Sequence, residues 1–130
     1  MKDNGALKED VLNYVKSKFD TSPEYLWKAY PTYAVLRHPN KKWYAAIMSL
    51  PKEKIGLVGE GEIDVVTAKC DSILQGGLLQ EKGFLPAYHM NKEHWIMALL
   101  DGSVEKEDIF FLLDNSYEII EKNKKTKKTS

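Results

Sequence analysis

The sequence of 130 residues contains a single cysteine, Cys70, which excludes an intramolecular disulfide. It also lacks a run of about 18 apolar residues, the length that a membrane-spanning helix needs. The first five residues carry no apolar segment of the kind found in a secretory signal. From these absences we expect a cytoplasmic protein that makes no membrane contact.

Motifs that bind phosphate or activate a serine are missing as well. Gly56, Gly59 and Gly61 are not followed by the Gly-Lys-Ser or Gly-Lys-Thr of a phosphate-binding loop. No serine lies in the Gly-x-Ser-x-Gly elbow of a serine nucleophile. We therefore interpret these glycines as turn residues and predict no cofactor.

The histidines and the cysteine suggest a metal site and a cysteine nucleophile, but the sequence does not supply all the residues that either site needs. His89 and His94 supply two metal ligands, whereas a catalytic zinc site needs about three, so Glu93 and Asp101 would have to converge on them. Cys70 with either histidine would be a nucleophile and its base, but apolar neighbours favour a core position for this residue. We predict no bound metal and no enzymatic activity, with histidine chemistry as the least favoured alternative.

The hydrophobic fraction of 43% and the charged fraction of 29% are typical of a globular protein that buries a core. Basic and acidic side chains number 19 each, but residues 122–130 hold five lysines and no acid. The remaining body therefore has 14 basic and 19 acidic groups. We predict one domain over residues 1–121 and a lysine-rich, disordered tail over 122–130.

Apolar residues at three- and four-residue steps predict a helix over residues 7–19. Segments rich in aromatic and β-branched residues predict strands at 25–28, 33–38, 43–50, 55–58 and 63–69. Turn residues at 39–42, between the second and third of these strands, favour an antiparallel hairpin.

The second half of the chain begins with another short helix. Asp71 is a suitable N-cap for it, and Gly83 is placed to end it. Residues 85–90 and 95–100 are predicted strands on either side of a hairpin loop at 91–94.

A last helix has the most regular pattern in the sequence. Ser103 is predicted to cap it, and its apolar stripe runs over residues 109–120. Strands joined by tight turns between terminal helices indicate an α+β fold. We predict an antiparallel sheet of about five to seven strands, flanked by N-terminal, middle and C-terminal helices.

The two predicted hairpin ends gather basic and aromatic side chains. These are Lys41, Lys42 and Trp43 at one end, and His89, Asn91, Lys92, His94 and Trp95 at the other. Such residues on a protruding loop donate to phosphate oxygens or base edges, and an exposed tryptophan stacks on an unpaired base. They form a predicted DNA-binding site. The alternative is that both tryptophans pack in the sheet core while the lysines keep the protein soluble.

A second class of function stays open beside DNA binding. The hairpin from Tyr88 to Trp95 would then form the wall of a pocket for a protein or a small molecule. A concave, partly apolar pocket beside this hairpin favours that alternative. A convex ridge with the lysines of both hairpin ends on one side favours DNA.

Several of these segments together resemble the MmcQ/YjbR family. The resemblance lies in Leu-Pro-Ala-Tyr-His-Met-Asn-Lys at 85–92, Glu-His-Trp at 93–95 and Leu-Asp-Gly-Ser at 100–103. It extends over Tyr-Pro-Thr-Tyr at 30–33, Trp-Tyr-Ala at 43–45, Lys-Cys-Asp at 69–71 and Leu112, Leu113, Ser116 and Tyr117. The resemblance implies a small bacterial protein with a CyaY-like α+β fold, often described as a double-wing DNA-binding type, with no agreed enzymatic activity or cofactor. The family's Tyr-His-Met-Asn-Lys-x-His-Trp run falls on residues 88–95.

Overall fold

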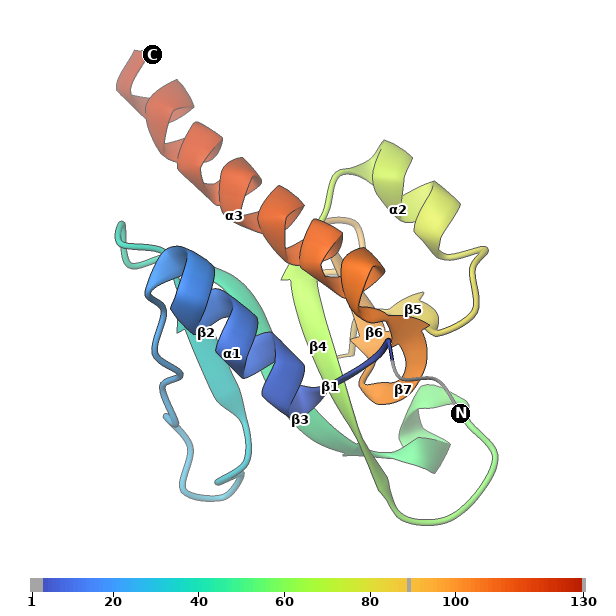
Figure 1. Ribbon diagram of the computed structural model, residues 1–130. Helices are drawn as coiled ribbons and strands as arrows, with labels where there is room; N and C mark the ends of the chain where they lie inside the picture. Colours follow the sequence, from blue (N-terminus) through green and yellow to red (C-terminus); the bar gives the residue numbers. More distant parts are fainter. Residues whose placement is uncertain (1–3, 89, 130) are drawn as a thin grey trace.

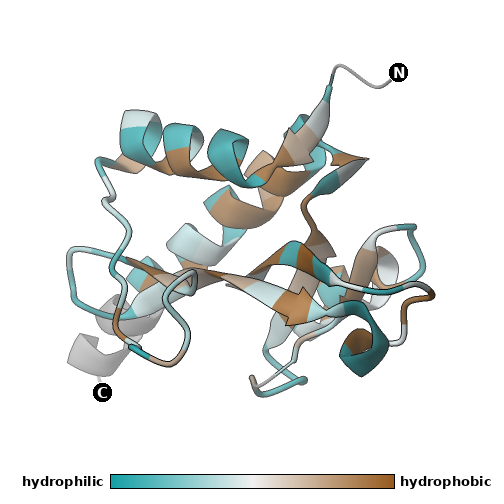
Figure 2. Ribbon diagram, turned by 90° about the horizontal axis from the view of Figure 1, so that it is seen from below, coloured by the Kyte–Doolittle hydropathy of each residue, from teal (hydrophilic) through white to brown (hydrophobic). Residues whose placement is uncertain are grey.

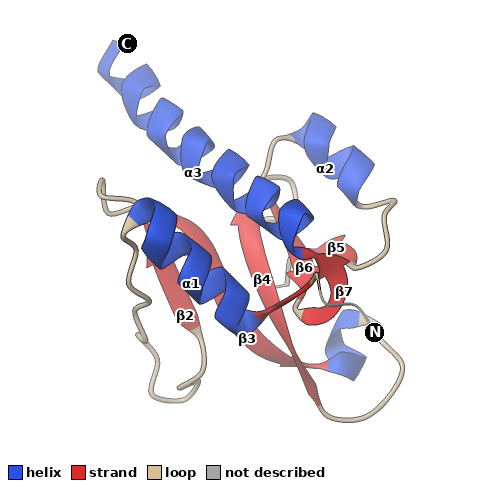
Figure 3. Ribbon diagram, viewed as in Figure 1, coloured by secondary structure: helices blue, strands red, loops and turns tan. Residues whose placement is uncertain are grey.

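A five-stranded antiparallel sheet is the centre of the structure (Figure 1). This computed structural model describes the backbone of residues 4–88 and 90–129 and the side chains of residues 4–88 and 90–122. Along the sheet the strands are β2 (Ala34–Arg37), β3 (Trp43–Pro51), β4 (Glu62–Lys69), β6 (Trp95–Leu99) and β5 (Phe84–Pro86). A smaller sheet pairs β1 (Gly5–Leu7) with β7 (Asp101–Glu105). The helices are α1 (Lys8–Phe19), α2 (Ser72–Leu78), α3 (Lys106–Thr129) and the short 3-10 helix η1 (Lys52–Ile55), coloured in Figure 3. The predicted α+β class is confirmed.

Helices α1 and α3 cover one face of the sheet (Figure 2). Their fully buried side chains recur at helical spacing: Val11, Val15, Ile109, Leu112 and Leu113. Tyr14 of α1 stacks on Phe110 of α3 with 3.9 Å between ring centroids, and its hydroxyl donates to Asp114 at 2.7 Å. Because stacked rings and a hydrogen bond join the two helices, they cover this face as one layer.

The opposite face of the sheet, which we call the open face, is covered by loops and by η1. Its buried cluster consists of Met48, Leu50, Ile63, Val65, Met97 and Leu99. Partly buried side chains from connecting segments pack on this cluster, among them Tyr33, Leu57 and Tyr88. Figure 2 shows the chain after α1 passing the edge of the sheet toward this face. The two faces therefore differ in the kind of cover they receive.

An irregularity in β3 decides which of two neighbouring aromatic residues faces the helices, because it puts Tyr44 on the same face as Ala45. The pairing with β2 shifts between Leu36 and Arg37, which leaves Tyr44 as an extra residue in β3. Tyr44 is fully buried under the helices, and its hydroxyl donates to Thr21 Oγ1 at 2.7 Å. Trp43 lies on the open face, where it lines a pocket.

Much of the predicted secondary structure is confirmed. The helix at 7–19 and the strands at 33–38, 43–50, 63–69 and 95–100 each match an observed element to within one residue at either end. Asp71 caps α2 as predicted, because its Oδ1 accepts from the Leu74 backbone N–H at 2.9 Å. The helix nevertheless ends at Leu78, well before Gly83.

Two predicted strands are wrong. Beside β2, within the described chain, Glu24 makes a single bridge to Val35, and residues 25–28 form no strand. Aromatic residues favour strands because they suit a pleated surface, but those at 25–28 belong to a loop. At residues 55–58 the chain leaves η1 through Gly56, which has a φ of +80°, and then turns.

The second hairpin and the start of the last helix also differ from prediction. The strand expected at 85–90 is the shorter β5, which ends at Pro86. Ser103 does not cap a helix: it lies in β7, where its hydroxyl donates to Asp101 Oδ1 at 2.5 Å. The helix begins later because β7 pairs with β1, and this contact between distant parts of the chain leaves no local sequence pattern.

In the part of the chain that the structure describes, no helix is both long enough and apolar enough to cross a membrane. The backbone of α3 runs to Thr129, but side chains from residue 123 onward lie outside those described. The predicted division into a domain at 1–121 and a disordered tail at 122–130 therefore stays a prediction.

Ser116 joins α3 to two strands and gives a test of this fold. Its buried hydroxyl accepts from the Lys69 N–H at 2.9 Å and donates to the Tyr44 carbonyl oxygen. Ser116→Ala leaves both backbone groups unpaired, so we expect the free energy of unfolding to fall by about 1–3 kcal/mol. Ser17→Ala on the exposed side of α1 is the matched control, with an expected change below about 0.5 kcal/mol. Urea denaturation measures both, and equal losses in the two variants would contradict the assignment.

Candidate functional site

The two hairpin ends singled out by the sequence lie at the same end of the sheet. Ala68 of β4 pairs with Ala45 on one side and with Ile96 on the other. Trp43 and Trp95, at the starts of β3 and β6, therefore lie near the same end of β4. One strand separates β3 from β6, so their backbones are about 10 Å apart.

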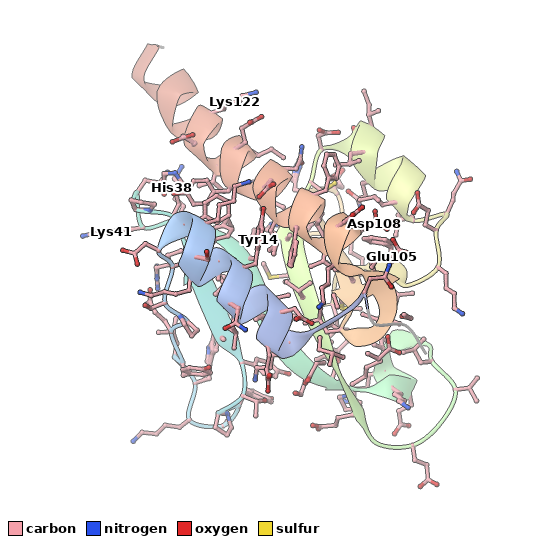
Figure 4. All side chains as sticks on the ribbon, viewed as in Figure 1. Tyr14, His38, Lys41, Glu105, Asp108 and Lys122 are labelled. Carbon is pink, nitrogen blue, oxygen red and sulfur yellow. The ribbon has the colours of Figure 1, made fainter. Side chains whose placement is uncertain are left out.

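The turn between β2 and β3 presents Lys41 to solvent (Figure 4). The Lys41 N–H donates to the His38 carbonyl and the His38 N–H to the Lys42 carbonyl, both at 2.8 Å. Asn40 Oδ1 accepts from the Lys42 N–H at 2.9 Å. The left-handed conformation falls on Lys41, with a φ of 76°, and not on Asn40 as expected from its residue type. Lys41 is exposed, whereas Lys42 is half-buried.

His38 holds this turn against α3. Its imidazole is buried, with its centroid 4.5 Å from that of the Tyr117 ring. Nδ1 accepts from the Asn40 N–H at 3.0 Å, and Nε2 lies 3.8 Å from the Glu121 carboxylate. Lys41 therefore extends from a backbone that is fixed on both sides.

The second hairpin end is organised by Asn91. Its side chain accepts from the Glu93 N–H at 2.8 Å, and its carbonyl accepts from the Trp95 N–H at 3.0 Å. Gln75 of α2 donates to the Lys92 carbonyl at 2.6 Å. The exposed side chains of Lys92 and His94 line a shallow groove beside α2. His89, also part of the predicted site, lies outside the described residues.

An aromatic pocket opens on the open face of the sheet. Its volume is about 340 Å³, and its lining is Trp27, Tyr30, Tyr33, Trp43, Ala46, Met48 and Met90. The Trp27 ring stands at 82° to Trp43 and at 75° to Tyr33, with centroids 5.7 and 6.2 Å away. Tyr30 stacks on Tyr33 at 4.7 Å. These rings hold one another in place and give the pocket an apolar aromatic wall, against which a flat, apolar group can lie.

The pocket lies to one side of the hairpin that was expected to form its wall. Among the described residues of 88–95, Met90 lines it. Tyr88 borders a smaller neighbouring cavity of about 160 Å³, and His94 faces α2. Trp95 stands two positions before the buried Met97 in β6, so it shares the open face with Met97. Trp43 and Trp95 are both half-buried, so neither is sealed in the core.

No lining side chain of the pocket is charged, and its cationic neighbour is Arg37. The Arg37 guanidinium lies 6.0 Å from the centroid of the Trp43 ring, within cation–π range. It also pairs with Glu24 at 3.0 Å and donates to the Lys41 carbonyl at 2.9 Å, which connects the pocket to the β2–β3 turn. Burial raises the pKa of Tyr33 above its ordinary value, so its hydroxyl stays neutral at pH 7.

Cys70 and His94 are backbone neighbours whose side chains lie in different environments. The Cys70 N–H donates to the His94 carbonyl at 2.8 Å, but Cys70 is buried in the helix-covered core while His94 is exposed. Burial raises the pKa of the Cys70 thiol to about 11, so it is not the thiolate that nucleophilic catalysis needs.

The metal ligands considered from the sequence also lie apart. His94 precedes β6 and Asp101 follows it, so a strand about 17 Å long separates them. Within the described residues, no three or more histidine, cysteine, aspartate or glutamate side chains are grouped so that they could hold a metal ion. Neither the nucleophile pair nor the metal-ligand set considered from the sequence is therefore assembled among the described residues.

Sequence reasoning missed most of the residues that build the pocket. The pattern assigned Trp27 to a strand and left Tyr30 and Tyr33 outside the site, whereas Met90 falls within the hairpin that was expected to form a pocket wall. The available signal was aromatic density, since four aromatic residues fall within positions 25–33. In the structure these aromatic residues belong to a loop that folds over the sheet, and they form no strand within it.

The sequence can also be compared with known proteins. A sequence model of the YjbR family matches residues 16–119 of this chain. The chain belongs to the YjbR family. The match includes both hairpins and the loop that lines the pocket, so the resemblance seen in residues 85–103 is confirmed over most of the chain.

Relatives of this YjbR-family chain agree with the fold. YyaQ of Bacillus subtilis, an uncharacterised protein, is 44% identical over 113 residues, which cover 86% of this chain and 96% of YyaQ. A crystal structure of a Pseudomonas syringae protein matches with a TM-score of 0.83 at 42% identity, over 86% of this chain and 97% of that one. A Deinococcus radiodurans protein matches with a TM-score of 0.67 at 20% identity, over 92% of this chain and 82% of that one, and shows the fold alone. The descriptions of these three relatives name no ligand and no activity.

The buried thiol gives a second test. At pH 8 we expect a thiol reagent to modify Cys70 in the folded protein at least about tenfold more slowly than in the urea-unfolded protein, because burial withholds both the sulfur and its thiolate form. The absorbance of the released chromophore gives both rates. Similar rates in the two states would show that Cys70 is accessible and that the core around it is wrongly assigned.

Proposed function

We propose that this YjbR-family protein is a non-enzymatic module that binds DNA with the end of the sheet where its two hairpin ends meet. One observation carries the proposal. Lys41 and Lys92 come from turns far apart in the sequence, yet both are exposed at the same end of the sheet. The proposal needs no metal and no cofactor.

The geometry of the turns supports phosphate contacts. Lysine donates to phosphate oxygens as a point charge, and a two-stranded β-ribbon is narrow enough to enter the major groove of duplex DNA. Lys41 extends from a turn that His38 and Arg37 hold in place. Such a contact fixes the protein on the DNA backbone without reading its sequence.

The charge of the body limits how this binding works. Outside the tail, acidic groups exceed basic ones by five, so the molecule as a whole does not attract DNA over long distances. The affinity must then come from a few lysines close to the phosphates. Binding of this kind weakens steeply as salt rises.

A second candidate function is the binding of a small molecule or a protein side chain in the aromatic pocket. Its support is the volume of about 340 Å³ with an uncharged lining, which falls in the range of small-ligand sites. Such a ligand has no need of Lys41 or Lys92. Removal of both lysines would leave its affinity unchanged.

A salt titration of DNA binding tests the leading proposal. We expect the slope of log K against log salt to fall by about one unit for each phosphate-contacting lysine removed in the Lys41→Ala, Lys92→Ala double variant. The matched control is the Lys54→Ala, Lys82→Ala double variant, which loses the same charge from exposed positions at the other end of the sheet. Fluorescence anisotropy of a labelled duplex gives K at each salt concentration.

Two outcomes would contradict the proposal. Failure of the wild-type protein to bind duplex or single-stranded DNA, even at low salt, would remove DNA as a ligand. Equal slopes in the two double variants would show that DNA binds elsewhere on the protein.

A further inference from the structure

The aromatic pocket has no part in phosphate contacts by Lys41 and Lys92, yet it opens beside the same end of the sheet. We infer that it holds the base of one unpaired nucleotide, with the phosphate of that nucleotide at the edge formed by Arg37. The inference rests on the proposed function where the nucleotide belongs to a DNA strand. A free mononucleotide presents the same chemistry, and the experiment separates the two sources.

The shape of the pocket selects a flat ring. Trp27 packs edge-to-face against both Trp43 and Tyr33, so a ring placed in the pocket against this cluster meets aromatic surface on more than one side. Met48 and Met90 complete the lining with adaptable apolar contacts. A volume of about 340 Å³ lies at the small end of ligand sites, which suits a single ring system.

The charges around the pocket decide between a neutral ring and a cation. Aromatic cages also bind quaternary ammonium groups, because the ring faces are electron-rich. Here the Arg37 guanidinium already lies 6.0 Å from the Trp43 centroid, and no carboxylate lines the pocket. A second cation would be repelled by Arg37, and the acid that pairs with Arg37, Glu24, is not among the lining residues. A neutral base carrying a phosphate is attracted instead.

Arg37 is placed to meet that phosphate. It shares its charge with Glu24 at 3.0 Å, but about a third of its side chain remains exposed, at 32%. It also donates to the Lys41 carbonyl, so the pocket edge and the basic turn form one continuous surface. A strand that contacts the turn through its backbone can place a neighbouring base in the pocket.

A base enters such a pocket only when it is unstacked. Bases in a duplex are stacked and paired, and their extrusion costs free energy that an unpaired strand does not require. Base stacking on aromatic side chains is tolerant of sequence. The pocket should therefore strengthen binding to single strands and contribute little to duplex binding.

Two tyrosines of the same loop provide a matched pair of variants. Tyr30 and Tyr25 are each 52% exposed, but only Tyr30 is among the pocket lining residues. We expect Tyr30→Ala and Trp27→Ala each to weaken the binding of a mixed-sequence single strand of about 12 nucleotides by about tenfold, and Tyr25→Ala to leave it unchanged. Duplex binding should be the same in all three variants. Thermal melts confirm that each variant is folded.

An abasic strand and free mononucleotides complete the experiment. The abasic strand keeps the phosphates and lacks the base, so wild type and Tyr30→Ala should bind it equally. Mononucleotides should quench the fluorescence of Trp27 and Trp43, read in a Trp95→Phe background, and Tyr30→Ala should abolish the quenching.

The outcomes separate the two proposals. Should Tyr30→Ala bind the single strand as tightly as Tyr25→Ala does, the pocket holds no base, whereas binding through the lysines still stands. Should the wild type bind no DNA while mononucleotides quench the pocket tryptophans, the proposed DNA binding fails and the pocket is a site for free nucleotides. Absence of both strand binding and quenching overturns the inference.

Discussion

Every residue from Tyr44 to Met48 is buried, so β3 needs apolar cover on both of its faces. Helices α1 and α3 cover one face with continuous stripes of side chains. The other face is covered by side chains from connecting segments, including Tyr33 and Tyr88. Separate loops close a sheet less completely than a helix does, and a pocket of about 340 Å³ remains between them. The aromatic site is thus a consequence of helices packed on one side only.

The antiparallel register adds the second half of the proposed binding surface. With β4 alone between β3 and β6, the β2–β3 turn and the connection before β6 must emerge at the same end of the sheet. The exposed Lys41 and Lys92 lie on these two segments, and Trp43 begins β3 directly after the first turn. Arg37 links this turn to the pocket through its contacts with Trp43 and the Lys41 carbonyl. Phosphate contacts and base stacking can therefore belong to one surface in a protein whose body is acidic overall.

Local periodicity allowed α1, β3 and the stripe of α3 to be predicted, because the apolar residues that define them are close in sequence. Local sequence also predicted Ser103 as a helix cap, and this prediction was wrong. Ser103 lies in β7, which pairs with β1 from the start of the chain. The candidate site, too, contains residues that local sequence predicts and contacts that it does not. Trp43 stood out because lysines precede it, but its contact with Trp27 depends on how a loop folds over the sheet, and no sequence period encodes that path. The extra residue that puts Tyr44 under the helices and Trp43 on the open face is equally invisible in the sequence.

The central claim is that the open face, at the end where the hairpin ends meet, is the surface that binds nucleic acid. Nitrogen–proton correlation NMR during titration with a short single strand tests it most directly. The account predicts that the indole signals of Trp27 and Trp43 and the backbone signals of residues 38–42 and 90–94 shift together and saturate at one concentration. Shifts confined to the outer surfaces of α1 and α3, or no shifts at low salt, would contradict it.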